Sequence, residues 1–94
     1  MIYQITFDSQ IKTIIQHFSP SLKQKIKIAF KEIAQNPYVG KVLQEELSGL
    51  YSYRVLRFRL IYMIDSKKKR IDVVTIGPRS SVYDALEQSL RKNK

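Results

Sequence analysis

The chain has 94 residues, of which 44% are hydrophobic, and its formal net charge is +9 at pH 7. This composition excludes wholesale disorder, and the length allows one modest core without a separate cofactor domain, so we expect residues 1–94 to form a single domain. Cysteine is absent, which excludes disulfides and thiolate chemistry. No apolar run approaches the roughly 20 residues of a membrane-spanning helix and no signal peptide is recognisable, so we predict a cytoplasmic protein without a membrane partner.

The first eighteen residues predict a short strand and a first helix. Residues 2–7 alternate in the manner of a strand that is partly apolar on both faces. Residues 9–18 place isoleucines and a phenylalanine at helical spacing. We therefore expect a helix there that needs a partner surface for its apolar stripe.

A second helix is predicted to begin directly after the first. Ser19 suits the N-cap, Pro20 suits the first helical position, and an apolar stripe continues to Ile33. Lysines line an exposed side of this helix, and Asn36-Pro37 ends it. Two adjacent amphipathic helices indicate a helical hairpin.

The second half of the chain predicts strands. Residues 37–50 are expected to form a loop, with or without one turn around residues 42–47. The expected strands are Tyr51 to Leu56, Arg57 to Ile64 and Arg70 to Ile76. A turn at 65–68 joins the last two, and a final helix is expected over 81–92. Grouped helices and grouped strands predict an α+β fold, with an antiparallel sheet of about four strands, the helical hairpin on one face and a short C-terminal helix.

Positive charge is concentrated in the second half of the chain. Residues 1–50 have six Lys/Arg against four Asp/Glu, and residues 51–94 have eleven against four. All six arginines lie between Arg54 and Arg91. A one-sided positive field steers anions, and the planar guanidinium suits forked contacts with phosphate. This pattern predicts a prepared anion site, with nucleic acid as the first partner to consider and an acidic protein as the second.

The geometry of the arginine-rich strands is left open by the sequence. A two-residue hairpin at Leu56-Arg57 would place Arg54 directly opposite Arg59, which is unfavourable unless an anion lies between them. An unbroken strand would instead place Arg57 and Arg59 on one face. A longer bend fits equally well, because leucine suits tight hairpin turns poorly. Each arrangement brings at least two guanidinium groups together.

Two runs of sequence resemble a known group of proteins. They are Y-R-V-L-R-F-R-L-I-Y at residues 53–62 and V-V-T-I-G-P-R-S-S-V-Y at residues 73–83. In these residues the chain is similar to the RelE/ParE superfamily of toxins from type II toxin–antitoxin pairs. The RelE branch implies cleavage of messenger RNA in the ribosomal decoding site, and the ParE branch implies inhibition of DNA gyrase without nuclease activity. The chain departs from the common pattern where Leu56-Arg57 replaces a Gly-Asp turn, and its one histidine is His17 in the first predicted helix.

The resemblance to the RelE branch implies roles for individual residues. Arg59, Arg79 and Tyr83 match the positions that contribute to cleavage. Arg54 matches the basic residue that opens the strand motif, Arg57 is the candidate for a second basic position, and both would position RNA. In metal-free cleavage the substrate's own 2′-hydroxyl attacks the adjacent phosphorus. We assign Arg59 and Arg79 to phosphate stabilisation, and Tyr83 to orienting the substrate, stacking on a base or proton transfer.

Further basic residues and partners complete the hypothesis. The run Lys67-Lys68-Lys69-Arg70 is interpreted as a solvated hairpin turn, with contact of its lysines with ribosomal RNA as the functional alternative. No metal-ligand spacing and no phosphate-cradling glycine loop are present, so we expect neither a metal nor a cofactor. The expected partners are mRNA on the ribosome, ribosomal RNA and a cognate antitoxin. The competing hypotheses are a gyrase inhibitor and a non-catalytic module that binds RNA or antitoxin.

Overall fold

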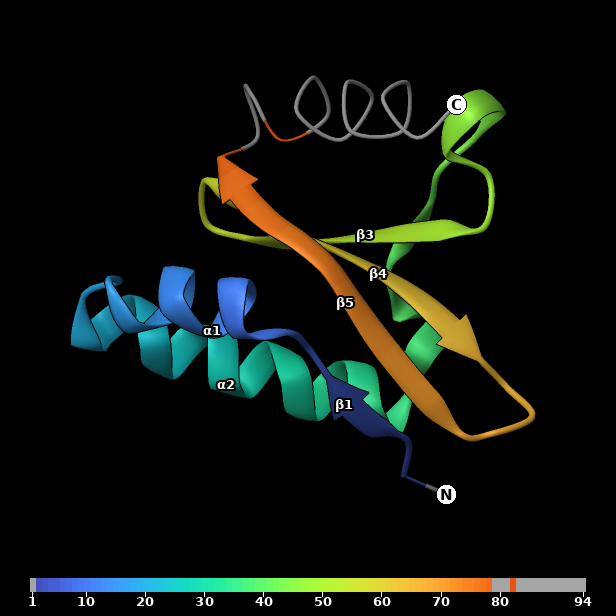
Figure 1. Cartoon of the computed structure of the whole chain (residues 1–94), viewed down its shortest axis with the longest axis horizontal. Helices are drawn as coiled ribbons and strands as arrows, with labels where there is room; N and C mark the ends of the chain where they lie inside the picture. Colours follow the sequence, from blue (N-terminus) through green and yellow to red (C-terminus); the bar gives the residue numbers. More distant parts are fainter. Residues whose placement is uncertain (1, 79–81, 83–94) are drawn as a thin grey trace.

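The computed structural model describes residues 2–78 and Val82. In this part of the chain two helices pack on one face of a five-stranded sheet (Figure 1). The helices are α1 (Ser9–Gln16) and α2 (Pro20–Gln35). The strands are β1 (Gln4–Thr6), β2 (Lys41–Val42), β3 (Leu50–Val55), β4 (Phe58–Asp65) and β5 (Arg70–Pro78). Two single 3-10 turns, Pro37–Val39 and Glu45–Leu47, interrupt the connection from α2 to β3.

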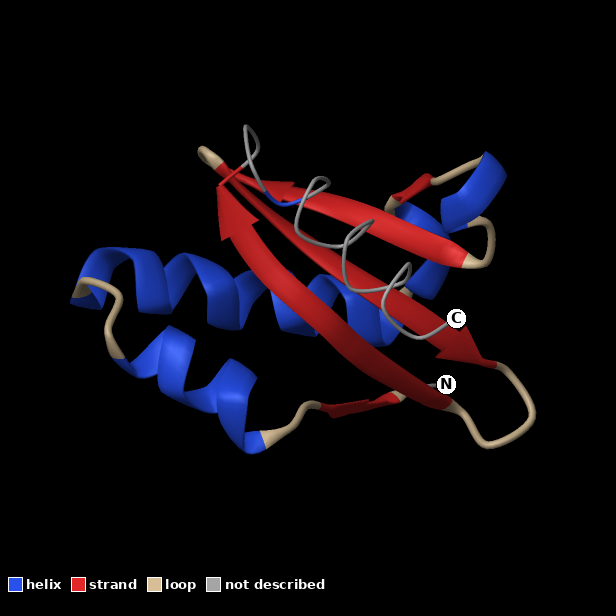
Figure 2. Cartoon of the chain, turned by 45° about the horizontal axis from the view of Figure 1, so that its top comes forward, coloured by secondary structure: helices blue, strands red, loops and turns tan. Residues whose placement is uncertain are grey.

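The strand order is β1-β5-β4-β3-β2, and every neighbouring pair except β1 and β5 is antiparallel (Figure 2). The predicted α+β class is therefore confirmed, with one correction and one addition. The predicted first strand, β1, pairs in parallel with β5 where an antiparallel sheet was expected, and β2 forms within the expected loop. Strand β2 pairs only Lys41 with Ser52 and Val42 with Tyr51, so it is too short to show alternation in the sequence. The expected helix over 81–92 lies outside the described residues apart from Val82.

Both helices begin at the residues that the sequence predicts. Asp8 caps α1 by accepting a hydrogen bond from Ile11 N at 2.9 Å, and Ser19 caps α2 by accepting one from Leu22 N at 3.2 Å. Helix α2 ends at Gln35, directly before the predicted Asn36-Pro37 stop. Among the described residues, no helix has the length and apolar content needed to cross a membrane.

The sheet carries apolar residues on both faces. The larger cluster lies between the sheet and the helices, and its buried members are Ile11, Ile26, Ala29, Ile33, Val55, Leu60, Tyr62, Ile71, Val73 and Ile76. A smaller cluster consists of Leu47, Leu50, Ile61 and Val82. Because Ile61 follows Leu60 in β4, the smaller cluster lies on the face opposite the helices. Val82 therefore packs against that second face.

The turn between β3 and β4 resolves the open geometry of the arginine segment. Val55 pairs with Phe58 and Arg54 pairs with Arg59, so Leu56 and Arg57 form a two-residue turn. Leu56 adopts φ +55°, a left-handed conformation that costs a non-glycine residue about 1–2 kcal/mol. The pairing of β3 with β4 along the whole of β3 outweighs this local cost.

Two tyrosines tie the helix layer and the α2–β3 connection to the sheet. The buried Tyr62 hydroxyl donates to Pro37 O at 2.7 Å and accepts from Gly40 N at 3.1 Å. The Tyr53 hydroxyl donates to the Glu32 carboxylate. Burial raises the pKa of Tyr62 to about 12, and the hydrogen bond to Glu32 raises the pKa of Tyr53 to about 12.

The raised pKa values of Tyr53 and Tyr62 predict that the folded chain loses stability at alkaline pH. Both bind their proton more tightly in the folded chain than in the unfolded chain, where tyrosine has a pKa near 10. Their contribution to the free energy of unfolding is therefore complete below about pH 10 and falls as the pH rises toward about 12. Urea unfolding between these limits checks this, with Tyr53→Phe expected to reduce the pH dependence. Tyr38→Phe, at an exposed tyrosine, is the matched control. If the free energy of unfolding falls equally with pH in the wild type, Tyr53→Phe and Tyr38→Phe, Tyr53 is not a source of the pH dependence.

Candidate functional site

Arg59 lies near the start of the central strand β4, on the sheet face opposite the helices. The residues on either side of it, Phe58 and Leu60, pack toward the helix layer, as the Phe58 ring shows by lying 4.9 Å from the Phe18 ring between centroids. Across the sheet Arg59 is opposite Arg54 in β3 and Gly77 in β5. One neighbour is thus another arginine, and the other has no side chain.

The guanidinium of Arg59 is only partly satisfied. The side chain is half-buried, and its buried Nε has no hydrogen-bond acceptor among the residues that the structure describes. The buried Nε of Arg70 in β5 also makes no hydrogen bond, but it lies 3.0 Å from Asp72 Oδ1 in an ion pair, and Arg70 Nη2 donates to Asp72 Oδ2 at 3.3 Å. A buried donor without an acceptor is costly and rare in native proteins. Phosphate oxygens are the acceptors that best match the forked donors of arginine.

Arg54 and Arg57, the neighbours of Arg59 across and along the β3–β4 hairpin, line a pocket that Arg59 itself does not line. It has a volume of about 480 Å³ and lies between the β3–β4 turn and the start of α2. Its lining residues are Ser19, Ser21, Leu22, Arg54, Leu56, Arg57 and Phe58. Arg54 Nε donates to Leu56 O at 3.1 Å, which fixes that guanidinium at the turn. No carboxylate contributes to the lining, so this described part of the site is basic.

The contribution of α2 to this pocket was not predicted. Ser19 and Ser21 stand at the start of a helix that is far from Arg54 in the sequence, and only the packing of α2 on the sheet brings them together. The sequence did indicate the helix start, through Ser19-Pro20, but not its neighbours. The N-terminus of a helix carries partial positive charge, which adds to that of the two arginines.

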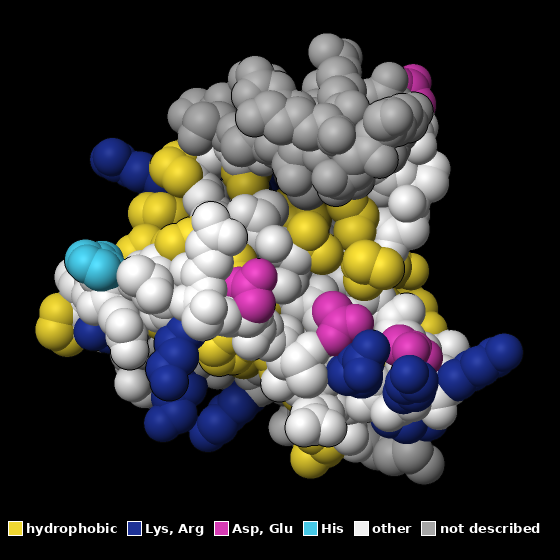
Figure 3. All heavy atoms as spheres, in the orientation of Figure 1, with side chains coloured by type: hydrophobic (Ala, Val, Ile, Leu, Met, Phe, Trp, Pro, Cys, Tyr) yellow, Lys and Arg dark blue, Asp and Glu magenta, His cyan; other side chains and the backbone are white. Residues whose placement is uncertain are grey.

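The lysine turn does not join the arginine site. Lys67, Lys68 and Lys69 connect β4 to β5, at the opposite end of β4 from Arg59, a separation of about 20 Å along the strand. Lys68 N donates to Asp65 Oδ1 at 3.0 Å, and the Lys69 ammonium lies 5.4 Å from the centre of the Tyr3 ring. Figure 3 shows basic side chains gathered around this turn at the lower right. Contact with ribosomal RNA at this turn stays a prediction.

Two of the predicted catalytic residues, Arg79 and Tyr83, lie outside the described residues. The structure does describe the residues next to them in the chain. Pro78 pairs with Phe58, the residue before Arg59, and Val82 is buried at 4% exposure in the cluster with Ile61. The meeting of Arg59, Arg79 and Tyr83 at one site therefore stays a prediction.

The described residues offer positive charge at Arg59 but no evident proton acceptor. His17 lies on the helix layer, where its Nδ1 is 2.8 Å from Thr13 O. Tyr53 and Tyr62, whose pKa values are raised, also face the helix layer. Within residues 2–78, no three His, Asp or Glu side chains gather as metal ligands would. This part of the site can bind and stabilise an anion, and proton transfer would need another group.

Comparisons with known proteins agree with this architecture. A family model described as "ParE toxin of type II toxin-antitoxin system, parDE" matches residues 2–83. Toxin RelG of Mycobacterium tuberculosis is 28% identical over 85 residues, which cover 88% of this chain and 98% of RelG. A chain of the toxin–antitoxin complex RelBE2 from the same species has a TM-score of 0.74 and 26% identity, with coverage of 84% of this chain and 100% of that one. A free-state mutant of E. coli toxin RelE shares the fold, with a TM-score of 0.76, 16% identity and coverage of 99% and 98%. The chain belongs to the RelE/ParE superfamily of toxins from type II toxin–antitoxin systems.

Proposed function

We propose that this toxin is a ribosome-dependent endoribonuclease that cleaves messenger RNA, and that a cognate antitoxin neutralises it. The observation that carries the proposal is the half-buried Arg59, whose Nε lacks an acceptor among the described residues and whose cross-strand neighbour is Arg54. The chain's similarity to RelG and to the RelBE2 toxin supports the RelE branch. The solved relatives include toxin–antitoxin complexes, which supports an antitoxin as partner.

The cleavage step uses the substrate as its own nucleophile. The 2′-hydroxyl oxygen attacks the adjacent phosphorus, the bond to the 5′ oxygen of the next nucleotide breaks, and the products are a 2′,3′-cyclic phosphate and a free 5′-hydroxyl. Negative charge grows on the non-bridging oxygens during attack, and Arg59 would donate to them. Removing one such donor commonly costs about 3–4 kcal/mol. Arg79 would supply a second donor, while Arg54 and Arg57 would hold neighbouring phosphates.

Arginine and tyrosine, the residue types proposed for cleavage, are poorly suited to proton transfer. Arginine has a pKa above about 12 and a tyrosine near 10, so neither type is an efficient base at neutral pH. Tyr83 would therefore act in orienting the substrate, stacking on a base or assisting proton transfer. A poor acid–base set fits an enzyme that depends on the ribosome to align the 2′-hydroxyl with the phosphorus. Contact of Lys67, Lys68 and Lys69 with ribosomal RNA would help to position it there.

A reconstituted cleavage reaction tests the proposal. Purified ribosomes carrying a defined mRNA and an initiator tRNA are mixed with the toxin, and the RNA ends are analysed. We expect cleavage only when ribosomes are present, with 5′-hydroxyl and cyclic phosphate ends. Intact mRNA in the presence of active ribosomes and folded toxin would overturn the proposal.

Substitutions at Arg79 and Tyr83 test the roles that we assign to these two residues in cleavage. We expect Arg79→Ala to abolish toxicity while the protein still folds and still binds its antitoxin, because the lost group acts on the phosphate. Tyr83→Phe should lower cleavage while keeping the aromatic ring. Growth after induction, thermal unfolding and antitoxin binding are measured on each variant. If Arg79→Ala unfolds the chain, Arg79 is structural and the assignment fails.

Inhibition of DNA gyrase is the second candidate function. It is favoured by the lack of a proton acceptor near Arg59 among the described residues, since an inhibitor needs none. A supercoiling assay with purified gyrase separates the two candidates. Loss of supercoiling at toxin concentrations that leave mRNA on ribosomes intact would assign the chain to this activity.

A further inference from the structure

The pocket between the β3–β4 turn and the start of α2 combines three kinds of chemical group. Arg54 and Arg57 supply guanidinium groups, Leu22 and Phe58 supply apolar surface, and two serines of the α2 start supply hydroxyls. Its volume of about 480 Å³ lies within the range of roughly 300–1,000 Å³ that is usual for small-ligand sites. A ligand that fills it would present an anionic group, an apolar face and polar edges.

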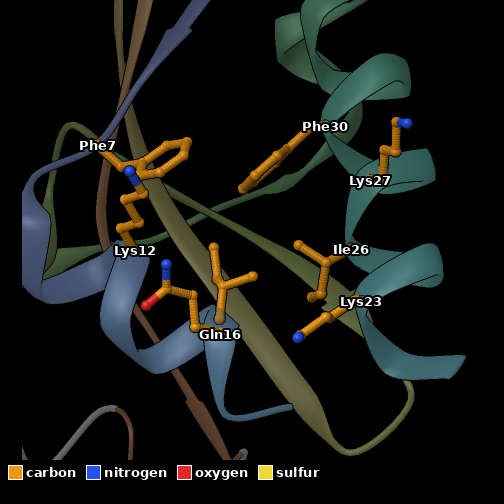
Figure 4. Close-up of a pocket in the computed structure, with 8 residues that line it drawn as sticks. Phe7, Lys12, Gln16, Lys23, Ile26, Lys27 and Phe30 are labelled. Atoms are coloured by element: carbon orange, nitrogen blue, oxygen red, sulfur yellow. The ribbon is translucent and has the colours of Figure 1, made fainter. Parts of the chain in front are cut away.

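The groove between α1 and α2 has a different chemistry. Figure 4 shows Phe7 and Phe30 from opposite sides of it, and its volume is about 200 Å³. Its basic lining residues are lysines, which act as point charges on flexible stems, whereas arginine presents a planar fork that matches phosphate. Among the described residues, the pocket at the β3–β4 turn is therefore the better match for a phosphate with a planar group attached.

Leu56 carries a local cost that its place in this pocket explains. Its φ is +55°, and its side chain lines the pocket while remaining 57% exposed. Glycine would adopt this conformation without strain, and this is the turn at which the chain departs from the Gly-Asp of the superfamily pattern. An exposed leucine adds little to the core, and strained backbone in native proteins gathers at ligand-binding sites. The wall that Leu56 forms is thus a reason for leucine at this position.

We propose that this pocket binds one nucleotide of the messenger RNA, next to the phosphate at Arg59, and gives cleavage a preference for certain bases. This identification rests on the proposed function. Arg54 and Arg57 would hold the phosphate of that nucleotide, and its base would pack against Leu56 and Phe58. Packing of this kind accepts every base, because each base has an apolar face. The serine hydroxyls, which both donate and accept, would then distinguish the polar edges of the bases.

Arg54 connects the pocket with the face that carries Arg59. The two arginines are directly opposite each other across the strands, which places their Cβ atoms roughly 5 Å apart. Arg54 also lines the pocket and donates from Nε to Leu56 O at 3.1 Å. An RNA strand bound at Arg59 can therefore continue over the end of the hairpin into the pocket. An acidic peptide would match the charge of the arginines, but its carboxylates would leave the apolar wall unused.

An abasic scan of a short RNA tests the pocket on the full-length toxin. The probe is a fluorescein-labelled single strand of about five nucleotides with 2′-fluoro sugars, so that no 2′-hydroxyl can attack. Each base is removed in turn while the phosphates stay, and binding is measured by fluorescence anisotropy. We expect one abasic position to weaken binding by about tenfold, a difference of about 1.4 kcal/mol, and the others by much less. Equal small losses at every position would overturn the proposal.

Substitutions at the pocket wall locate this effect. Leu56→Gly removes the wall and relieves the positive φ, so it should fold and should reduce the loss at that abasic position to within about twofold. Ser21→Leu fills the pocket and should do the same. Gln24→Leu, at an exposed residue of α2 that does not line the pocket, is the matched control and should keep the full loss. Thermal unfolding confirms that each variant folds. A full loss in folded Leu56→Gly and Ser21→Leu would overturn the proposal.

Competitors identify the chemistry of the occupant. We expect adenosine 5′-monophosphate to displace the RNA at a concentration at least about tenfold lower than inorganic phosphate, because the base adds contacts with the wall. Equal potency would show a site for anions only and would overturn the proposal. A glutamate-rich peptide that binds tightly, and whose affinity falls in Leu56→Gly, would assign the pocket to an acidic protein instead.

The ribosomal reaction keeps this proposal separate from the proposed function. In wild type, cleavage rates should differ between codons that vary only in the base bound by the pocket, and in Leu56→Gly their ratio should approach one. Base-dependent RNA binding without any cleavage on ribosomes would support the pocket and refute the nuclease. Cleavage on ribosomes without base-dependent binding or codon preference would support the nuclease and refute the pocket.

Discussion

Replacing Arg59 by alanine is expected to lower the rate of ribosome-dependent mRNA cleavage by about 10²–10³-fold. The guanidinium would otherwise donate to phosphate oxygens whose charge grows in the transition state, and nothing else in strand β4 can replace it. Arg59→Lys should recover part of the rate, because it keeps the charge and loses the fork. Single-turnover cleavage on programmed ribosomes measures both variants.

The same substitution should leave the fold intact. The Nε of Arg59 makes no hydrogen bond with a described residue, so its removal breaks none there and relieves a buried unpaired donor. We expect the free energy of unfolding to change by no more than about 1 kcal/mol, in either direction. Arg57→Ala, at an exposed turn residue, is the comparison, and it should weaken RNA binding more than it slows cleavage. A cleavage rate within about threefold of wild type in folded Arg59→Ala would contradict the assignment of Arg59.

Replacing Gly40 by alanine is expected to cause the largest loss of stability, about 2–4 kcal/mol. A Cβ atom at this position would lie 2.4 Å from Tyr62 Oη and 3.0 Å from Ser52 O. Gly40 has φ −75°, so the cost comes from space and not from the backbone conformation. The buried tyrosine would have to move, and its hydrogen bonds to Pro37 O and Gly40 N would weaken. Urea unfolding measures the loss, and the melting temperature should fall by roughly 4–8 °C per kcal/mol.

A double variant tests whether the clash with Tyr62 causes the loss of stability in Gly40→Ala. In Gly40→Ala/Tyr62→Phe the hydroxyl that the new methyl group meets is gone, so the combined loss should be at least about 1 kcal/mol smaller than the sum of the two single losses. Gly49→Ala is the control for backbone strain, because Gly49 has φ +90° and open space around it. Additive losses in the double variant would show that the clash with Tyr62 is not the reason.

The parts of the fold that local chemistry dictates could be predicted from the sequence. Ser19-Pro20 and Asn36-Pro37 mark the two ends of α2 because caps and prolines act on their own neighbours. The pairing of Arg54 with Arg59 was one of the alternatives, and local preference argued against it because Leu56 has to adopt a positive φ. The pairing of β3 with β4 along the whole of β3 outweighs the local preference of Leu56. The energy of that pairing depends on the whole sheet, so the residues of the turn alone do not reveal it.

Features that depend on distant segments could not be predicted. The parallel placement of β1 beside β5 joins residues such as Ile5 and Ile71, which no local pattern connects. The pocket formed by Ser21 with Arg54, and the groove between α1 and α2, likewise exist only after the helices pack. Among the site residues, the structure places Arg54, Arg57 and Arg59 at one end of the sheet, as the sequence suggested.

Mapping of RNA 5′ ends across the transcriptome, shortly after the toxin is induced, tests the central claim most directly. The account predicts new 5′-hydroxyl ends within translated coding sequences in cells that make the wild-type toxin, and none in cells that make equal amounts of Arg59→Ala. Growth arrest without new ends in coding sequences would contradict it.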